Sequence, residues 1–147
     1  MSLRQKLEDE VKAAMRAGDA TARDTLRMVL SKLKGAEIDT GKASSDQDVL
    51  AALTYAVKTR RESIEQFDQA GRTDLADVER AQVAVLERYL PKQLSEDEAR
   101  AAAAAVIAEL GATSKQDLGR VMKALLARHK GALDGKLAGR LVGELLG

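Results

Sequence analysis

The stretch LERYLPKQLSEDE, residues 86–98, decides how the chain is organised. It contains Pro91, the only proline of the protein, and proline stops a helix because it lacks a backbone N–H and its ring clashes with the preceding turn. Ser95 and Glu98 then have the spacing of a capping box, in which each side chain accepts from a free backbone N–H at a helix start. One helix ends and another begins here, so we predict a domain boundary after residue 91.

The composition predicts helices on both sides of this boundary. Hydrophobic residues make up 45% of the 147 residues but aromatic residues only 2%. The core must therefore be built from Leu, Val, Ile, Met and Ala, a mixture that favours helices, whereas strands favour β-branched and aromatic side chains. We predict an all-α protein with an N-terminal helical domain of about four helices, residues 1–91, followed by a small three-helix C-terminal module, residues 92–147.

Small polar residues mark where the helices should begin. Such a side chain at the N-cap accepts a hydrogen bond from a backbone N–H that has no partner inside the helix. Apolar residues follow at three- and four-residue steps, which is the spacing of a buried helix face. The expected starts are Ser2, Asp19, Ser45 or Asp46, Thr73, Ser95, Thr113 or Ser114, and Asp134.

Several classes of function lack the residues that they need. There is no cysteine, and His129 is the only histidine, so a zinc centre cannot be assembled from such ligands. The nucleophile, phosphate-loop and zinc-protease motifs are missing as well. We therefore predict no catalytic residue, no metal and no cofactor. The His129 ring is expected to touch the core at the end of the sixth helix, and the alternative is a polar contact to a ligand.

The N-terminal residues and the hydropathy pattern bear on location. In MSLRQKLEDEVKAAM, residues 1–15, acidic residues lie between the spaced apolar ones and there is no continuous apolar run, unlike a signal or transit peptide. No run approaches the roughly 18 to 20 apolar residues of a membrane span. These features predict a cytoplasmic protein without a membrane partner.

Basic residues gather near the C-terminus, although the formal net charge is only +1. Residues 111–147 contain seven Lys or Arg and three Asp or Glu, which gives a net charge of +4 for this part. On the sixth predicted helix the exposed face is basic and contains no acid. We predict that nucleic acid binds to six of these seven basic residues, which are Lys115, Arg120, Lys123, Lys130, Lys136 and Arg140.

Glycine occupies every fourth position in GALDGKLAGRLVGELLG, residues 131–147. Gly131 is expected to end the sixth helix and Gly135 to lie in the first turn of the seventh. Gly139 and Gly143 then lie in a helix interior, where each costs roughly 0.5 to 1 kcal/mol relative to alanine. They indicate either close packing against another helix, which is the commoner cause, or a smooth surface that a nucleic-acid backbone can approach.

Three basic residues of the third predicted helix form a second candidate site. Arg60 takes an apolar position, where its charge is costly unless the head group reaches solvent or meets an acid. The acids within reach are Glu62, Glu65 and Glu79. Lys58, Arg60 and Arg61 are therefore expected either to hold helices or domains together or to contact phosphate.

Four segments together resemble the GatB/YqeY family. They are ARDTLRMVLSKLKGAEID (22–39), VKTRRESIEQFDQAGRTDLADVE (57–79), LERYLPKQLSEDE (86–98) and GATSKQDLGRVMKALLARHKGALDGKLAGRLV (111–142). Ala132 and Leu133 depart from the family's pattern, which often has a basic and a small residue there. Gln82 stands where the family often has an acid.

The resemblance implies a function. It implies a C-terminal module similar to the tail of the B subunit of glutamine-dependent aspartyl/glutamyl-tRNA amidotransferase, a tail understood to contact tRNA. It also implies the family label of carbon–nitrogen ligase with glutamine as amide donor. We expect a tRNA-binding accessory protein that is not catalytic alone; the alternative is a protein-interaction module that docks on an aminoacyl-tRNA synthetase or an amidotransferase.

Overall fold

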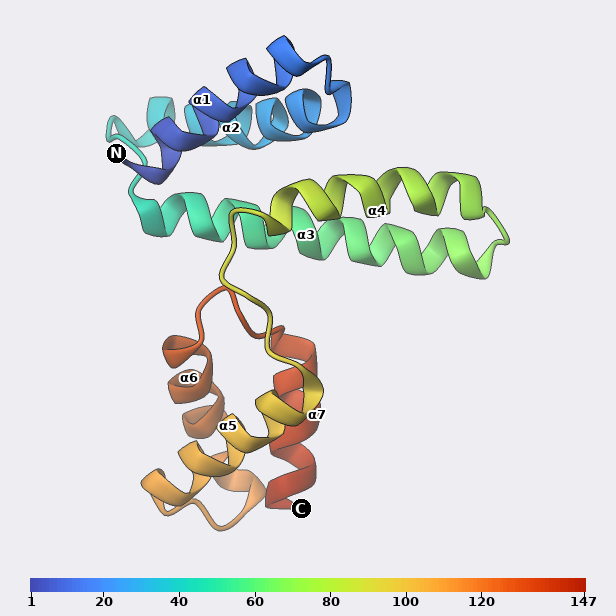
Figure 1. Ribbon diagram of the computed structural model, residues 1–147. Coiled ribbons are helices and arrows are strands. Elements are labelled where there is room, and N and C mark those ends of the chain that lie inside the picture. The colour runs from blue at the N-terminus through green and yellow to red at the C-terminus, as the bar shows by residue number, and fades with distance from the viewer. The chain divides into compact units, whose positions relative to one another are not determined.

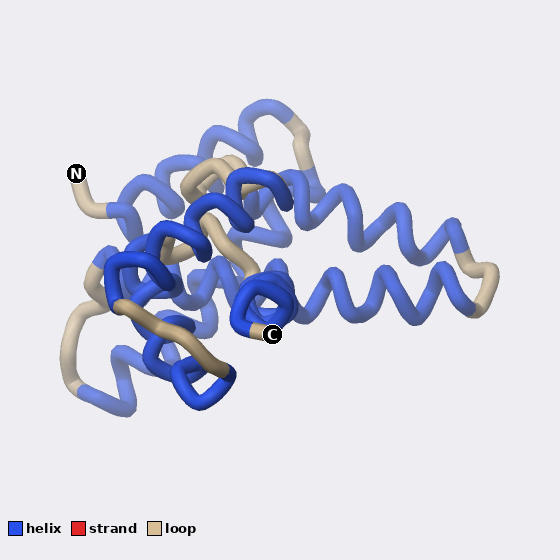
Figure 2. The backbone as a smooth tube through the Cα atoms, turned by 90° about the horizontal axis from the view of Figure 1, so that it is seen from below, coloured by secondary structure: helices blue, strands red, loops and turns tan.

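Seven α-helices and one short 3₁₀ helix make up the chain, and no residue lies in a β-strand, as the tube of Figure 2 shows. The computed structural model describes every residue from Met1 to Gly147. The predicted all-α class is confirmed. The elements are α1 (Leu3–Ala17), α2 (Ala20–Thr40), α3 (Asp46–Gln69), α4 (Thr73–Glu87), α5 (Glu96–Leu110), the 3₁₀ helix (Lys115–Asp117), α6 (Leu118–Arg128) and α7 (Gly135–Leu146).

The chain divides into two compact units, an N-terminal unit, Met1–Leu90, and a tail unit, Pro91–Gly147. The division lies beside the proline that interrupts the helical pattern. That each unit folds by itself as a domain stays a prediction. No helix has both the length and the apolar surface to cross a membrane.

Two pairs of helices form the N-terminal unit. Helix α1 lies along α2, and α3 lies along α4, as Figure 1 shows, while α2 also contacts both α3 and α4. The core of the unit contains the fully buried side chains of Leu7, Leu26, Leu53 and Leu86. Burial of each such leucine contributes about 1.5 to 3 kcal/mol.

Three helices contact one another in the tail unit. Helix α5 contributes mainly alanines to the core, such as Ala99 and Ala103, whereas α6 and α7 contribute larger side chains, such as Leu125 and Leu141. Because the apolar residues of α6 and α7 face this core, their basic residues are left on the outside. The core therefore sets which residues of the tail unit can meet a partner.

Most of the expected helix starts are confirmed. The side chains of Ser2, Asp19 and Asp134 accept from backbone N–H groups at 3.1, 3.0 and 2.9 Å. Ser45 and Ser95 each form a complete capping box. These caps depend on residues three positions apart, so the sequence alone could locate them.

At two expected starts the predicted side-chain cap is missing. Helix α4 begins at Thr73, but Arg72 is its N-cap residue and no side chain caps it. Before α6, the chain forms the 3₁₀ helix, where the backbone N–H of Thr113 donates to Asp117 at 3.0 Å. Neither Thr113 nor Ser114 caps a helix with its side chain, because Asp117 supplies the acceptor at this turn from inside the 3₁₀ helix.

Candidate nucleic-acid interface

Helices α6 and α7 hold the basic side chains of the tail unit by burying their opposite faces. In α6, Val121 and Leu125 are buried while Lys123 is exposed, and in α7 the buried Leu141 contrasts with the exposed Lys136. All six residues predicted to bind nucleic acid are exposed. For the four that lie in α6 and α7, this exposure follows from helical periodicity, since residues half a turn away from the core stripe must face solvent; Lys115 lies in the 3₁₀ helix and Lys130 in the turn after α6.

Three of the six have a free ammonium group. Lys115, Lys123 and Lys136 form no ion pair or hydrogen bond through their side chains. An exposed lysine without an acid partner has no neighbouring carboxylate to offset its charge and keeps its conformational freedom. These three residues, which we call the free lysines, are therefore the side chains best able to meet a phosphate.

The two arginines of the predicted set already have partners. Arg120 donates to the backbone oxygen of Leu110 at 3.2 Å and to Asp117 at 3.1 Å. Arg140 forms ion pairs with Glu96 of α5 and, at 3.1 Å, with Glu144. Both arginines are thus less available to a ligand than the sequence suggested.

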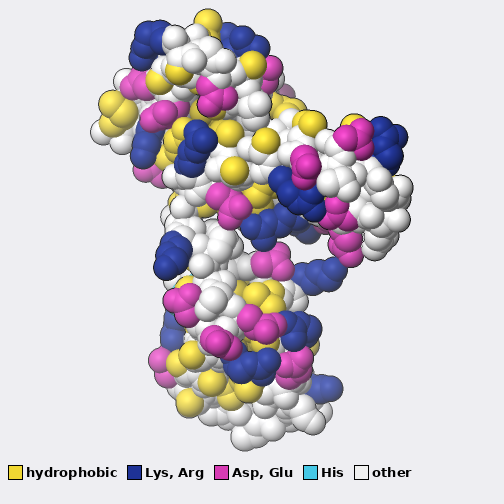
Figure 3. Space-filling model, turned by 45° about the vertical axis from the view of Figure 1, so that its right-hand side comes forward, with side chains coloured by type: hydrophobic (Ala, Val, Ile, Leu, Met, Phe, Trp, Pro, Cys, Tyr) yellow, Lys and Arg dark blue, Asp and Glu magenta, His cyan; other side chains and the backbone are white.

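These ion pairs change the charge of the surface. Hydrogen bonds from Arg100 and then from Arg140 hold the pKa of Glu144 below its usual range, so its carboxylate stays ionised beside them. Arg128, which was not among the predicted site residues, pairs with Glu109 of α5. The face seen in Figure 3 accordingly has basic and acidic side chains next to one another.

The expectation of a basic face without acids therefore needs correction. Helix α6 itself contains no acid, as expected, but α5 and the 3₁₀ helix bring Glu109 and Asp117 to its arginines. Helical periodicity within α6 could not reveal partners that lie on other elements.

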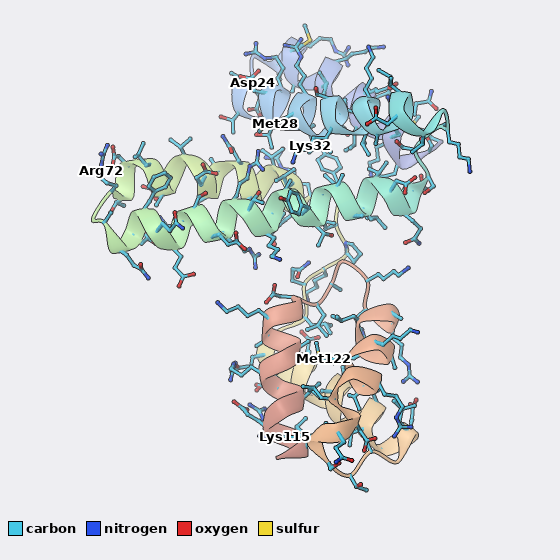
Figure 4. The ribbon with its side chains drawn as sticks, turned by 180° about the vertical axis from the view of Figure 1, so that it is seen from behind. Asp24, Met28, Lys32, Arg72, Lys115 and Met122 are labelled. Carbon is cyan, nitrogen blue, oxygen red and sulfur yellow. The ribbon has the colours of Figure 1, made fainter.

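The packing interpretation of the two interior glycines is wrong within the tail unit. A methyl group on Gly139 would lie 3.9 Å from the terminal methyl of Met122, an ordinary contact, and one on Gly143 would meet no atom within 4 Å. Figure 4 labels Met122, which α6 contributes to this neighbourhood. No helix approaches either glycine closely enough to require the missing side chain, so the second interpretation stays a prediction.

The region after α6 contains two further residues with a predicted role, Gly131 and His129. Gly131 has a φ of 74°, a left-handed conformation that favours glycine and turns the chain after α6. His129 is the C-cap residue of α6 and is half-buried. No three histidine or acidic side chains are grouped so that they could hold a metal ion.

The basic cluster of α3 is arranged differently from the prediction. Arg60 does not meet an acid: its Nε donates to Oε1 of Gln82 at 2.8 Å and its NH1 to the backbone oxygen of Ala56 at 3.0 Å. Arg61 forms the ion pair between α3 and α4, with Glu87 at 3.2 Å. Lys58 is exposed and has no ion pair. The acid expected beside Arg60 is replaced by the neutral amide of Gln82.

The fold and the tail unit define a class of protein: an all-α chain with a three-helix C-terminal unit that carries exposed lysines. The model of the family described as YqeY-like protein matches residues 4–146. The chain therefore belongs to the YqeY-like family, and the resemblance to the GatB/YqeY family seen in its sequence is confirmed.

Relatives occur among fungi. An uncharacterized protein of Schizosaccharomyces pombe is 37% identical over 93 residues, which are 63% of this chain and 72% of the relative. Altered inheritance of mitochondria protein 41, mitochondrial, of Meyerozyma guilliermondii is 34% identical over 57% of this chain and 44% of the relative. The Clavispora lusitaniae protein of the same name is 33% identical over 60% of this chain and 52% of the relative. The matched region thus spans about half the length of each of these two mitochondrial relatives.

The predicted cytoplasmic location is contradicted by these comparisons. Relatives from several fungi are named as mitochondrial proteins, which conflicts with a plain cytoplasmic location. The prediction rested on the composition of the N-terminal residues. These residues form α1 and bury Leu7 and Val11 in the core, so their pattern reports on folding and not on compartment.

Proposed function

We propose that this protein is a tRNA-binding accessory protein and that the tail unit forms the binding surface. The observation that carries the proposal is the set of free lysines, which are exposed on the 3₁₀ helix, α6 and α7. The likeness of this region to the tail of an amidotransferase subunit supports tRNA as the partner. The role is one of binding, and any amide chemistry implied by the family label falls to other subunits.

Phosphate contacts would provide most of the affinity. Lysines that neutralise phosphates release condensed counterions, so binding weakens as the salt concentration rises. With only 2% aromatic residues the chain has few rings on which bases could stack. Recognition would therefore follow the shape and the backbone of a folded RNA more than its base sequence.

The test compares charge reversal in the two units. In full-length protein, Lys123→Glu with Lys136→Glu should weaken tRNA binding about tenfold or more and reduce the dependence of log K on log salt by about 1 to 2, because two phosphate contacts are lost. Lys12→Glu with Lys34→Glu is the matched control, since both lysines are exposed in the N-terminal unit without an ion pair. Filter binding or fluorescence anisotropy over a salt series measures the affinity and its salt dependence for each double variant. Equal binding by the two double variants would contradict the assignment.

Docking on a protein partner is the second candidate. The open edge at Gly139 and Gly143 favours it, because a helix of another protein could approach there closely. A synthetase or an amidotransferase would be such a partner. The Lys123→Glu, Lys136→Glu variant separates the two candidates. If it no longer binds tRNA but still binds the protein partner, docking on the partner does not depend on the free lysines.

A further inference from the structure

Arg60 of α3 is the only charged residue that is buried, with 9% of its surface exposed. A guanidinium removed from water needs either a negative charge or a full set of acceptors, because its desolvation is otherwise not offset. Its side-chain hydrogen-bond partner on α4, Gln82, is neutral. The tail unit offers the contrast, since its four arginines, Arg100, Arg120, Arg128 and Arg140, all pair with carboxylates.

The hydrogen bonds of Arg60 leave part of its head group without an oxygen acceptor. A guanidinium has five N–H groups. One donates to Gln82 and one to the backbone oxygen of Ala56, and NH2 lies 3.8 Å from the sulfur of Met28, a weak acceptor. The remaining N–H groups are free to bind a ligand oxygen.

A pocket of about 350 Å³ lies at this head group. Its lining comes from α2, α3 and α4 and consists of Met28, Thr59, Arg60, Ser63, Glu79 and Gln82. The hydroxyls of Thr59 and Ser63 donate to backbone oxygens of α3, at 3.1 and 3.2 Å. Arg60 is the only basic side chain of the lining and Glu79 the only acidic one, and Met28, labelled in Figure 4, is contributed by α2.

We propose that this pocket binds an oxyanion, the phosphate or carboxylate group of a small molecule, on the guanidinium of Arg60. The anion would supply both the missing negative charge and the missing acceptors, and charge-assisted hydrogen bonds of this kind are about twice as strong as neutral ones. This site lies in the N-terminal unit, and the inference does not depend on tRNA binding by the tail unit.

Glu79 opposes anion binding in the pocket. It lines the pocket but is not among the hydrogen-bond or ion-pair partners of Arg60. Its carboxylate therefore repels an anion without satisfying the guanidinium, and removal of its charge should strengthen binding. Two exchanges between an acid and an amide, three residues apart on α4, should therefore change the affinity for an anion in opposite directions. Glu79→Gln should raise the affinity and Gln82→Glu should lower it.

The experiment titrates the full chain with inorganic phosphate and, separately, with acetate, at constant ionic strength against chloride. Calorimetry and the NMR signal of the Arg60 Nε–H report binding. Gln82→Glu supplies an internal carboxylate to Arg60 and should weaken binding about tenfold or more. Glu79→Gln should tighten binding, and Arg61→Gln, which removes an exposed neighbouring charge, should leave it unchanged. Opposite effects of two conservative exchanges cannot come from unfolding.

The two anions distinguish the sources of the ligand. Preferential binding of phosphate assigns a phosphate group, and preferential binding of acetate assigns a carboxylate. Absence of binding of both, or equal binding by wild type and Gln82→Glu, overturns the proposal. The Gln82→Glu variant should still bind tRNA, whereas Lys123→Glu with Lys136→Glu should still bind the small anion, so the two proposals can fail separately.

Discussion

In the N-terminal unit, Arg60 is buried and its side-chain hydrogen-bond partner is the neutral Gln82, whereas in the tail unit Arg140 is exposed and contacts two carboxylates, Glu96 and Glu144. The buried guanidinium lacks a counter-charge, and the exposed one already has two. The exposure of a basic side chain therefore does not show whether the side chain is free to bind a ligand. In the tail unit, the surface that can meet phosphate is defined by lysines, not by the more conspicuous arginines.

The same contrast appears in how each unit forms its charge contacts. Arg4 of α1 donates to both carboxylate oxygens of Glu37 of α2, each at 2.7 Å, and both side chains are about one-fifth exposed. The ion pairs of Arg140 lie at the surface, where solvent screens them. Charge contacts in the N-terminal unit should therefore affect stability more than those in the tail unit.

The largest expected effect comes from supplying the missing acid beside Arg60. Gln82→Glu should raise the free energy of unfolding by about 1 to 2 kcal/mol, since a neutral hydrogen bond becomes a charge-assisted one. In the tail unit, Glu144→Gln removes an exposed acid from two arginines and should change stability less. Urea denaturation of both variants measures the difference. A loss of stability in Gln82→Glu would show that Arg60 is already satisfied.

A smaller effect is expected at the glycines of the tail unit. Gly143→Ala should raise the free energy of unfolding by about 0.5 to 1 kcal/mol, because alanine favours the helix and the new methyl group meets open space. Gly131→Ala is the matched control and should lower it by about 1 kcal/mol, because its φ of 74° strains any residue with a side chain. Thermal unfolding measures both.

The glycine variants also report on the binding surface. If Gly143 is a point of close approach, the stabilised Gly143→Ala protein should bind its partner more weakly. If stability and affinity both rise, no partner approaches at this glycine.

The smallest effect is confined to acid conditions. Hydrogen bonds from Arg4, followed by the backbone N–H of Ser44, lower the pKa of Glu37 from 4.5 to about 2. Since this folded-state pKa lies below the unfolded value, the contact stabilises the protein above pH 4.5 and is lost as the pH falls towards 2. The stability of the N-terminal unit should therefore fall as the pH is lowered from 4.5 towards 2. Glu37→Gln should remove that part of the pH dependence. NMR signals of the two units followed during acid titration measure it.

How far the sequence predicted the molecule depended on the distance over which each feature is set. The cap at Ser45, the capping box at Ser95 and the helix that ends before Pro91 follow from residues within one turn. The exposed positions of Lys123 and Lys136 follow from periodicity along a single helix. Features of this kind were predicted correctly because the interactions that decide them join residues that are close together in the sequence.

Partners on different elements were not predicted. Arg140 and Glu96 lie 44 positions apart, and Arg60 and Gln82 lie 22 apart. No helical wheel can bring such pairs together, because their distance depends on how the helices pack. The sequence left two interpretations of the interior glycines open for the same reason, since only a neighbouring helix could show whether space was needed.

The sequence by itself determined the all-α class, most helix limits and the basic character of the C-terminal residues, because caps, prolines and apolar spacing act within a few residues. Only the tertiary structure decided which of those charges stay free. It neutralised Arg140 with an acid of α5, left Lys115, Lys123 and Lys136 without partners, and buried Arg60 against an amide. Coulomb energy and desolvation depend on separation in space, and helix packing sets that separation.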